Sequence, residues 1–524
     1  MKVTKNREVF EEKRPNTNSN TSPLLQLVTV ISLFFVALPI FYLVKRALQS
    51  ERATLQMVIF RFKTLEVLLT TISLVLLVAT FATLLGLAIA WSLNSISLPG
   101  NAILRALVIL PIAIPSYVFT YAWLSLGFLP SGFIAAVVVL TLSTTPYVTL
   151  AVMAALRRVD SSQLDVARTL GLNQLHTLLK ITLPQIRNAV GAGALLVSLY
   201  VLSDFGAVSL LGVDTFTRSI QNTYQGSFDR SSASVLALML VAISAFVIFM
   251  ENRSRQKSIT VKSSVSLTKR ISQIDARPIR AISLSLLFAY ILLSLALPIS
   301  VLIYRFISRP TGLDIASLGS AAFSTVTVSL LGAVVALLLA LPIALLAARE
   351  VRLGRIAERG VLLVNALPGI VMGLALVSLG SDLPFVYQTL GLLAISYSIL
   401  FLARSVGSIR TSIAKVPIQL TEIAATLGQT RLRVFFRVTL PLAAPGVLTG
   451  TLLVFLSAMK ELPATLMLRP TGFETLATEM WSNTAIFRFS EAAPYALLLV
   501  LIAAIPTFLI SRPDRELSER GELQ

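Results

Sequence analysis

Long apolar blocks alternate with short polar segments along most of the chain. Each block holds about twenty residues, enough for an α-helix to cross the ~30 Å hydrocarbon core of a bilayer. Six blocks precede a polar, basic stretch at residues 251–280, and six follow it. The predicted spans cover residues 24–44, 65–93, 104–126, 132–156, 189–211 and 233–250, then 281–304, 318–348, 360–380, 387–403, 442–468 and 491–511. The pattern predicts an all-α integral membrane protein with about 12 transmembrane helices.

The composition supports a membrane protein and excludes several kinds of site. Hydrophobic residues make up 55% of the 524 residues and charged residues only 13%, whereas a soluble domain has roughly 25% charged residues. The sequence has no cysteine, which excludes disulfides, thiolate metal sites and iron–sulfur clusters. Its single histidine, His176, excludes a histidine metal cage. No redox centre built from protein ligands is expected.

The distribution of basic residues predicts the orientation in the membrane. With the N-terminus inside, 32 of the 44 Lys and Arg residues fall on predicted inner segments and 11 on outer loops, while Lys460 lies within a span. Lys and Arg accumulate on cytoplasmic loops of membrane proteins, so both termini are expected in the cytoplasm. The first outer loop, with five basic residues between Lys45 and Lys63, is the exception. Because this topology explains the net charge of +19, no nucleic-acid partner is expected.

The two halves of the chain are related in sequence by a single shift of 257 residues. The matched sets are Leu110-Pro111 with Leu367-Pro368, Leu170-Gly171 with Leu427-Gly428, Thr182-Leu183-Pro184 with Thr439-Leu440-Pro441, and Asp204 with Glu461. Such a constant offset indicates a duplicated and fused six-helix unit. An even number of spans gives both repeats the same topology, related by a pseudo-two-fold axis along the membrane normal. A pathway is expected between the halves.

This duplication sets the predicted organisation of the chain. The first apolar block is too long for a signal peptide and has no clear cleavage site after it, so it is expected to remain as a span. The predicted parts are a cytoplasmic N-terminal tail at 1–23, a first six-helix repeat at 24–250, a basic cytoplasmic linker at 251–280, a second six-helix repeat at 281–511 and a cytoplasmic C-terminal tail at 512–524.

The loop between the fourth and fifth spans of each repeat carries the most informative pattern. An acidic residue, Asp165 or Glu422, starts a short helix of small and apolar residues, where its charge suits the positive end of the helix dipole. A glycine, Gly171 or Gly428, can stop that helix or allow a left-handed turn. A proline then suits the first turn of the next span. We expect a rigid helix–turn–helix at the cytoplasmic face.

Both loops resemble the EAA loop of ABC importer permeases in residue types and spacing. The departures are Asp165 in place of glutamate, and Val166 and Ile423 in place of the first alanine. In that family the loop docks onto the ATPase subunit and transmits nucleotide-driven closure to the membrane helices. The resemblance implies a docking role for Asp165, Ala167, Gly171 and Pro184 in the first copy and for Glu422, Ala424, Gly428 and Pro441 in the second.

The same resemblance implies partners for the chain. The sequence lacks the G-x-x-x-x-G-K-[ST] phosphate loop, so another polypeptide must use ATP and Mg²⁺, and this chain is expected to be a transport subunit that is not an enzyme and binds no cofactor. With two docking loops, one copy is expected to serve two ABC ATPase subunits, which we expect to form a homodimer. A periplasmic or surface-tethered substrate-binding protein and the lipid bilayer complete the expected partners.

The segments after the docking loops are similar to those of the fused twelve-span ferric-iron permeases. The run from Met459 to Thr465 carries this similarity most clearly, and the resemblance extends from near residue 60 over most of the chain. It implies a permease of the bacterial plasma (inner) membrane that moves ferric iron. Related permeases for thiamine, polyamines and phosphonates share the architecture and are alternatives, because fold alone does not specify cargo.

Ionisable residues and prolines inside the spans are the candidate pathway residues. A charged residue at the bilayer centre costs ~2.5 kcal/mol or more, so Asp204, Glu461 and Lys460 are functional candidates. Fe(III) prefers oxygen ligands, and the two acids could contact such a metal transiently. Alternatively they hold helices together, with Glu461 beside Lys460. Pro111 and Pro368 could break helices near a pathway or be packing kinks.

Two other classes of transport protein fit twelve spans. A secondary transporter also uses two parallel repeats, but it needs no docking helix–turn–helix in the same loop of both. A channel would call for a selectivity-filter run or a ring-forming repeat, and the sequence shows neither. The paired loops therefore favour an ATP-driven importer.

Overall fold

The computed structural model describes residues 22–49, 52–127, 130–159, 161–226, 230–259, 277–308 and 312–511. The regular elements within these ranges are helices, which confirms the all-α class. Among the described residues, nine helical segments are long and apolar enough to cross a membrane. They are α1 (Pro23–Leu48), α3 (Phe62–Ser95), α6 (Phe133–Leu156), η3 with α9 (Leu178–Ser203), α12 (Arg230–Ile259), α13 to α14 (Arg277–Ile307), α15 (Ile315–Ala348), α18 (Leu390–Ala414) and α20 to α21 (Arg431–Met459).

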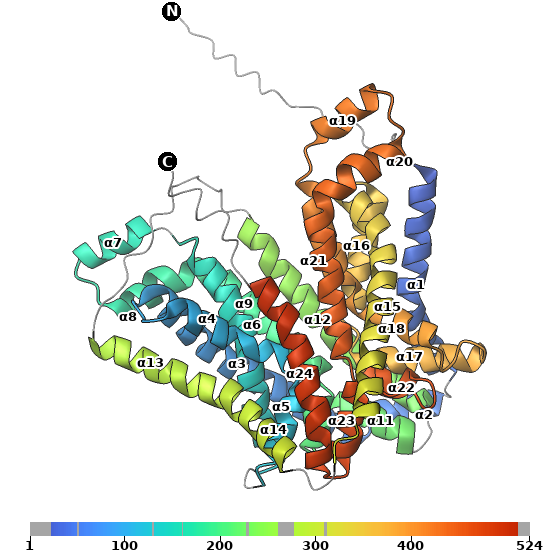
Figure 1. The fold of residues 1–524 in the computed structure, drawn as a ribbon, viewed down its shortest axis with the longest axis horizontal. Coiled ribbons are helices and arrows are strands. Elements are labelled where there is room, and N and C mark those ends of the chain that lie inside the picture. The colour runs from blue at the N-terminus through green and yellow to red at the C-terminus, as the bar shows by residue number, and fades with distance from the viewer. Residues whose placement is uncertain are drawn as a thin grey trace, which may run out of the picture.

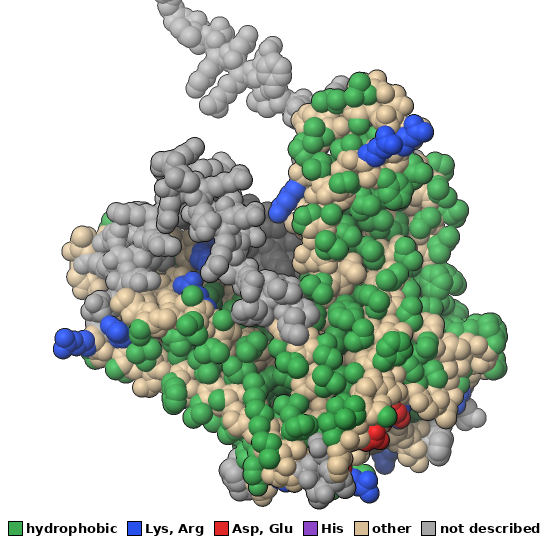
Figure 2. Space-filling model, in the orientation of Figure 1, with side chains coloured by type: hydrophobic (Ala, Val, Ile, Leu, Met, Phe, Trp, Pro, Cys, Tyr) green, Lys and Arg blue, Asp and Glu red, His purple; other side chains and the backbone are tan. Residues whose placement is uncertain are grey.

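The outer surfaces of these helices are apolar, as lipid contact requires. On α3, Leu76 and Leu84 are 62% and 61% exposed, and on α15 Phe323 is 74% exposed. Figure 2 shows apolar side chains over much of both lobes of the molecule. Exposed apolar area of this extent is rare on soluble proteins and matches a bilayer environment.

Two further spans, predicted at 104–126 and 360–380, are each bent sharply between two helices, so the alternative that prolines break helices there is the one observed. In the first repeat, α4 (Asn101–Ile109) and the turn η2 (Leu110–Ala113) meet α5 (Ser116–Leu124) at 92°. In the second, α16 (Arg352–Val364) meets α17 (Gly369–Asp382) at 104°. Pro115 and Pro368 directly precede α5 and α17 and have extended backbone angles. Proline disfavours helical geometry in the residue before it, which places the bend there.

The fifth span of each repeat ends earlier than predicted. Helix α9 ends at Ser203, and the short helix α10 (Gly206–Leu210) follows after a break. Helix α21 (Leu440–Met459) ends at Met459, before α22 (Pro463–Leu468). The C-terminal ends predicted for the spans 189–211 and 442–468 were therefore wrong. The apolar run continues through the break, so hydrophobicity alone does not reveal it.

Pro184 and Pro441 lie inside continuous helices instead of starting them. Helix α8 (Gln174–Thr177) runs without interruption through the π-helical turn η3 (Leu178–Thr182) into α9 (Leu183–Ser203). Helix α20 (Arg431–Val434) continues in the same way through η5 (Phe435–Thr439) into α21. Proline removes one backbone donor from a helix, and a wider π turn just before it accommodates the loss.

The molecule has two lobes, and each receives a helix from the other repeat (Figure 1). Helix α1 packs against α15, α16 and α17 of the second repeat. Conversely, α13 (Arg277–Ile291) and α14 (Leu297–Ile307) pack against α3, α4 and α5 of the first. The hydroxyl of Tyr290 on α13 donates a hydrogen bond to the Leu142 carbonyl, 3.1 Å away. The repeats of the sequence are therefore not the lobes of the structure.

Three helices form the centre of each lobe and approach closely at matched glycines. In the first lobe α6 packs between α3 and α9, and in the second α18 packs between α15 and α21. A Cβ atom on Gly193 would lie 3.1 Å from Cα of Val148, and one on Gly450 would lie 3.2 Å from Cα of Ser405. Both members of the second pair lie 257 residues beyond those of the first. Small residues allow such backbone contact between membrane helices.

The two ends of the molecule carry different elements (Figure 1). The helices α7 (Ser161–Thr169) and α19 (Ile418–Thr426) lie at one end, here named the loop face. The opposite face carries α2 (Arg52–Phe60), α11 (Phe216–Gly226) and α23 (Leu476–Ala485).

Ion pairs on the opposite face involve two of the five basic residues between Lys45 and Lys63. Lys45 pairs with Asp382, and Lys63 pairs with Asp214 at 2.8 Å and with Glu66 at 3.3 Å. Nearby carboxylates thus balance the charges of Lys45 and Lys63, two of the basic residues that made the first outer loop an exception to the charge rule.

The predicted linker at 251–280 is helical at both described ends, because α12 extends to Ile259 and α13 begins at Arg277. Residues 260–276 lie outside the described residues, as do residues 1–21 and 512–524 of the two predicted tails. The last helix, α24 (Phe489–Ser511), is apolar and follows α23.

Candidate coupling loops and translocation pathway

The first predicted docking loop is a short helix closed by a left-handed glycine. Helix α7 contains Asp165 and Ala167, and the latter is buried; the side chain of Asp165 lies outside the described atoms. Gly171 has φ +76°, and the Leu172 amide donates to the Ala167 carbonyl at 3.1 Å. This bond spans five residues and is typical of a Schellman cap. The predicted left-handed turn is confirmed.

The second loop repeats this geometry. Gly428, at the end of α19, has φ +77°, and the Gln429 amide donates to the Ala424 carbonyl at 3.1 Å. Thr430 then caps α20 through a hydrogen bond from the Arg433 amide to its hydroxyl at 3.4 Å. Glu422 is exposed on α19. It lies in the middle of α19, as Asp165 does in α7, so the expectation that these acids start the helices was wrong. Two segments 257 residues apart therefore fold into the same helix–turn–helix.

Both loops present exposed apolar side chains at matched positions. Leu170 and Leu427 are each 75% exposed, and Val166 and Ile423 are 57% and 55% exposed. Helix α19 has no buried residue. Figure 1 shows α7 and α19 at the loop face, one on each lobe. Matched apolar positions on two projecting helices are typical of a surface that binds a partner.

Each loop is joined by a continuous helix to an acidic residue at its far end. The helix that starts at Gln174 ends at Ser203, directly before Asp204. The helix that starts at Arg431 ends at Met459, just before Lys460 and Glu461. Thirty helical residues span about 45 Å at 1.5 Å per residue. Displacement of a loop can therefore be carried through the membrane to the break.

Asp204 and Glu461 both cap the short helix that follows them. The buried carboxylate of Asp204 accepts hydrogen bonds from the amides of Ala207 at 3.0 Å and Val208 at 3.3 Å. Glu461 Oε1 accepts from the Ala464 amide at 3.1 Å. Acidic side chains at helix N-termini satisfy amides that have no partner within the helix. The repeat mates thus share one structural role.

Lys460 does not pair with Glu461. Its ammonium donates to the Ile112 carbonyl at 3.2 Å, and the Tyr117 hydroxyl donates to the Lys460 carbonyl at 3.3 Å. Ile112 belongs to η2 of the first repeat, the turn that also contains Pro111. Lys460 therefore joins the two halves at the bend of the first, and the proposed Lys460–Glu461 pair is absent from the described residues.

Pro368 lies beside Glu461. A Cβ atom on Gly369, the residue after Pro368, would be 2.2 Å from Glu461 Oε1, so a side chain there would displace this carboxylate. In the first repeat, Pro115 holds the same place, directly before α5 and with extended backbone angles. The structural counterpart of Pro368 is therefore Pro115, although Pro111 occupies the matching sequence position.

The described residues contain no group of three or more His, Asp or Glu side chains placed to hold a metal ion. Asp204 and Glu461 direct their carboxylates to their own short helices. Transient contact of these acids with a metal stays a prediction.

Sequence reasoning missed Arg404, which it assigned to a cytoplasmic segment after a span ending at residue 403. Helix α18 continues to Ala414, so Arg404 lies within the helix, ten residues before its end. It donates a hydrogen bond to the Ser457 hydroxyl and lies 5.1 Å from the centroid of the Phe401 ring. Comparison of the two repeats could have identified this position. The shift of 257 residues aligns Arg404 with Tyr147, which lies inside the predicted span 132–156, and it aligns Ser457 with Tyr200.

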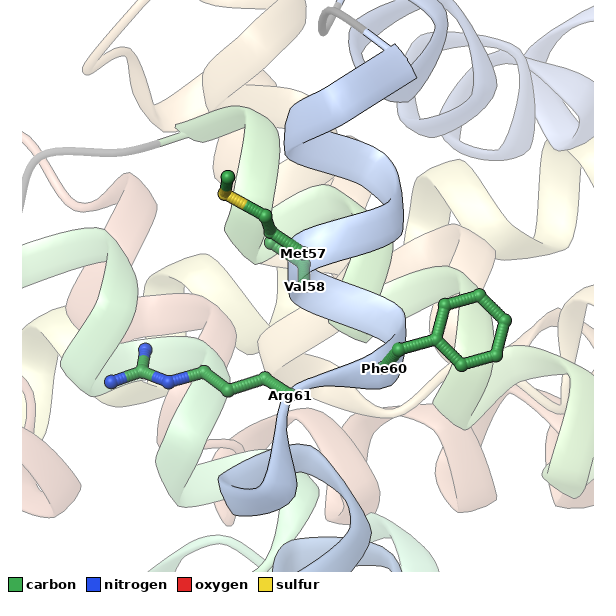
Figure 3. A pocket seen from close by; sticks show the side chains of 4 residues that line it. All are labelled: Met57, Val58, Phe60 and Arg61. Carbon is green, nitrogen blue, oxygen red and sulfur yellow. The ribbon is translucent and has the colours of Figure 1, made fainter.

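An open recess at the end of α2, lined by Met57, Val58, Phe60 and Arg61, is not a candidate binding site. Figure 3 shows the side chains of Phe60 and Arg61 pointing in opposite directions. Met57 and Phe60 are 73% and 83% exposed. Side chains that diverge in this way cannot converge on a ligand.

Comparison with known proteins identifies the class of this fold and its loops. The model of the binding-protein-dependent transport system inner membrane component family matches residues 82–258 and again residues 340–512. The chain belongs to this family and carries its domain twice, so it is a multi-pass inner-membrane permease of a transport system. The two matches leave out α1, α13 and α14, the helices exchanged between lobes.

Individual relatives cover different shares of the chain. The Fe(3+)-transport system permease protein FbpB 2 of Haemophilus influenzae is 32% identical over 500 residues, which are 93% of this chain and 98% of that protein. The putative 2-aminoethylphosphonate transport system permease protein PhnU of Salmonella choleraesuis is 28% identical over 42% of this chain and 87% of its own length. The molybdenum transport system permease protein ModB of Haemophilus influenzae is 36% identical over 31% of this chain and 79% of its own length.

Proposed function

We propose that this chain is the membrane-spanning subunit of an ABC importer for ferric iron. The observation that carries this proposal is the similarity to the Fe(3+)-transport permease FbpB 2, which extends over 93% of this chain and 98% of that protein. The phosphonate and molybdenum permeases match less than half of the chain. A relative that shares both fused repeats is the better guide to cargo.

The helices α7 and α19 are the proposed docking sites for the ATPase subunits. Their left-handed glycines, Gly171 and Gly428, have nearly equal φ angles of +76° and +77°, which supports equivalent turns in the two docking sites. Two equivalent sites on one chain fit two ATPase subunits, which we propose to be identical. ATP and Mg²⁺ act in those subunits, since this sequence contains no phosphate loop.

The loop face is proposed to lie in the cytoplasm, together with both termini. The 32 basic residues on the predicted inner segments, against 11 outside, support this orientation. The substrate-binding protein then docks on the opposite face, which carries α11 and α23. Cargo released there enters between the lobes, near the breaks at Asp204 and Glu461.

Coupling follows from the continuous helices. When the ATPase subunits close, they move α7 and α19, and the helices from Gln174 to Ser203 and from Arg431 to Met459 transmit the movement. The breaks at Asp204 and Glu461 lie at the far ends of these helices. The short helices α10 and α22 that follow the breaks pack against α5 and α17, the helices that begin at the bends. Rotation of one lobe against the other therefore changes the pathway at the level of the breaks.

Transport by the reconstituted importer tests this function. The chain is placed in proteoliposomes with its ATPase and binding protein, and uptake of ⁵⁵Fe(III), molybdate, 2-aminoethylphosphonate and thiamine is measured with and without ATP. We expect ATP-dependent uptake of iron alone. Uptake of another compound in preference to iron would refute the cargo, and uptake without the ATPase would refute the mechanism.

A further inference from the structure

The connection between α1 and α3 contains a helix for which the other repeat has no room. Residues 49–61 form this connection and include the nine-residue helix α2. The corresponding connection between α14 and α15, residues 308–314, has only seven residues. The first family match begins at residue 82, so α2 also lies outside the shared domain. Its role must therefore be sought in its own contacts and surface.

Hydrogen bonds fix the angle between α2 and α3. The hydroxyl of Thr64, a buried residue, donates to the Val58 carbonyl at 2.6 Å, and the Thr64 amide donates to the Arg61 carbonyl at 2.9 Å. Arg61 has extended backbone angles and joins the two helices. Helix α2 also packs against α12. The helix thus has a defined place on the opposite face.

A stripe of exposed apolar side chains runs along α3 from this corner. Its members recur every three or four residues, which places them on one face of the helix. They are Phe62, Leu65, Leu69, Ile72 and Leu76. Leu76 lies near the middle of the 34-residue helix, where an exposed apolar side chain contacts lipid. Phe62 is therefore the outermost member of a lipid-facing stripe.

Apolar and charged side chains meet at the level of Phe62. Phe62 is 80% exposed, and the exposed apolar surface continues onto Phe60 and Met57 of α2. In the same turn of α3, Lys63 and Glu66 form an ion pair. Large apolar side chains beside ionic ones are typical of the boundary between lipid headgroups and hydrocarbon.

Arg61 lies at this boundary with its side chain exposed. Figure 3 shows that its guanidinium points away from the Phe60 ring. Among the described residues it forms no ion pair within 4.0 Å. The divergence of Phe60 and Arg61 argues against a pocket for a small ligand, but it suits a boundary between two media. Arginine can reach headgroups from such a position and bind phosphate through paired hydrogen bonds.

We propose that α2 and the first turn of α3 bind phospholipid at the outer surface of the membrane. Phe60 and Phe62 enter the acyl-chain region just below the headgroups, and Arg61 binds the phosphate of an outer-leaflet phospholipid. Continuity with the lipid-facing stripe of α3 favours lipid over a soluble protein as the occupant. This anchor goes beyond the proposed function, because it does not depend on the cargo.

The anchor lies where the chain passes between lobes. Helix α1 packs against α15, α16 and α17, whereas α3 packs against α6 and α9 of the other lobe. Helix α2 joins the two. Binding to the membrane surface would hold this crossing at a constant depth when the lobes rotate.

Site-directed spin labelling tests the depth of the two phenylalanines. The labelled variants of this cysteine-free chain, studied in nanodiscs, are Phe60→Cys, Phe62→Cys, Leu76→Cys and Thr471→Cys. Relaxation of each nitroxide by oxygen, which concentrates in hydrocarbon, is compared with relaxation by a water-soluble nickel chelate. We expect positions 60 and 62 to resemble position 76 and favour oxygen. Position 471, exposed on the opposite face, should favour nickel.

A preference for nickel at positions 60 and 62 equal to that at position 471 would overturn the anchor. If these two labels favour nickel and lose mobility only when the substrate-binding protein is added, the surface docks a protein and the proposal also fails. Both side chains are exposed, so cysteine leaves no cavity in the fold. Gel filtration checks that each variant is folded.

Arg61→Gln tests the headgroup contact separately. Phosphatidylglycerol is titrated onto the full chain in detergent, and the melting temperature is followed, because a ligand of the native state raises it. We expect a smaller rise for Arg61→Gln than for the wild type. Arg218→Gln is the matched control, since Arg218 lies on the same face but pairs with Asp214 at 2.7 Å, and it should keep the full rise. Equal rises in the wild type and Arg61→Gln would refute the headgroup contact.

Discussion

Asp204 combines two possible roles that a pair of substitutions can separate. Its carboxylate accepts two amide hydrogen bonds of α10, which an alanine cannot replace. We expect Asp204→Ala to lower stability by about 1–2 kcal/mol, as loss of a helix cap does, and to lower the melting temperature of the purified permease.

Asp204→Asn keeps an acceptor oxygen and should retain most of that stability. If iron uptake nevertheless falls with Asn, the charge itself serves the pathway. Normal uptake with Asn and Glu461→Gln together would leave both acids as capping residues alone. Lys460 does not complicate the interpretation of Glu461→Gln, because its ammonium donates a hydrogen bond to the Ile112 carbonyl.

Arg404 shows why residue types alone mislead at this scale. An arginine after an apolar run usually marks the end of a span, because the charge is costly in lipid. Here the side chain donates a hydrogen bond to Ser457 of α21, and the helix continues for ten further residues. The equivalent residue of the first repeat, Tyr147, lies inside helix α6. In the sequence, only this comparison distinguishes Arg404 from a loop residue.

At the scale of elements, the left-handed glycines of the docking loops can be tested directly. Valine at Gly171 or Gly428 must adopt φ near +76°, which costs about 1–2 kcal/mol for a residue with a Cβ atom. We expect the docking helix to be displaced, with weaker ATPase co-purification and little uptake, while the membrane helices still form.

Gly100→Val is a control for backbone strain, because Gly100 also has a positive φ, +65°, but precedes α4. It should leave ATPase association unchanged. Wild-type association in both Gly171→Val and Gly428→Val would show that these turns do not set the docking geometry.

The close approach of α18 and α21 gives a second prediction at this scale. Gly450→Val adds atoms where even a Cβ would lie 3.2 Å from Ser405 backbone, and overpacking typically costs 1–3 kcal/mol. We expect a lower melting temperature. Gly319→Val, in a helical position with no atom within 4 Å of an added Cβ, should have little effect. Equal melting temperatures would contradict close packing at Gly450.

Elements were predictable from the sequence where hydrophobicity marks both ends, as for α6, which was expected at 132–156 and spans Phe133–Leu156. The docking turns were also predictable, because a glycine after an amphipathic helix has few alternatives. The breaks before Asp204 and Glu461 were not, since apolar residues continue to Leu211 and Leu468. Nor was the bend at Pro368 distinguishable from an ordinary kink, because the decisive contact, Gly369 with Glu461, joins distant segments.

At the scale of the molecule, the predicted orientation can be tested in this cysteine-free chain. Arg431→Cys places a thiol on the exposed loop face, and Thr471→Cys places one at the opposite face. In intact cells an impermeant thiol reagent should label position 471 and not position 431, because a charged reagent does not cross the bilayer. After permeabilisation both should react. Labelling of 431 alone from outside would reverse the topology.

The exchange of α1 for α13 and α14 between the lobes has a consequence for how the chain is made. Helix α1 enters the membrane first, but the surface it covers on α15 to α17 is completed only at Asp382, roughly 330 residues after Leu48. At 5–20 residues per second, synthesis of that length takes about 15–70 s. Until then α1 lacks these partners from the second repeat, and α12 of its own repeat, which also packs against α1, is itself complete only at Ile259. Thr29 and Ser32 of α1 are buried in the finished protein. Both hydroxyls donate to carbonyls of their own helix, Leu25 and Val28, so the waiting helix exposes no unsatisfied hydroxyl to lipid.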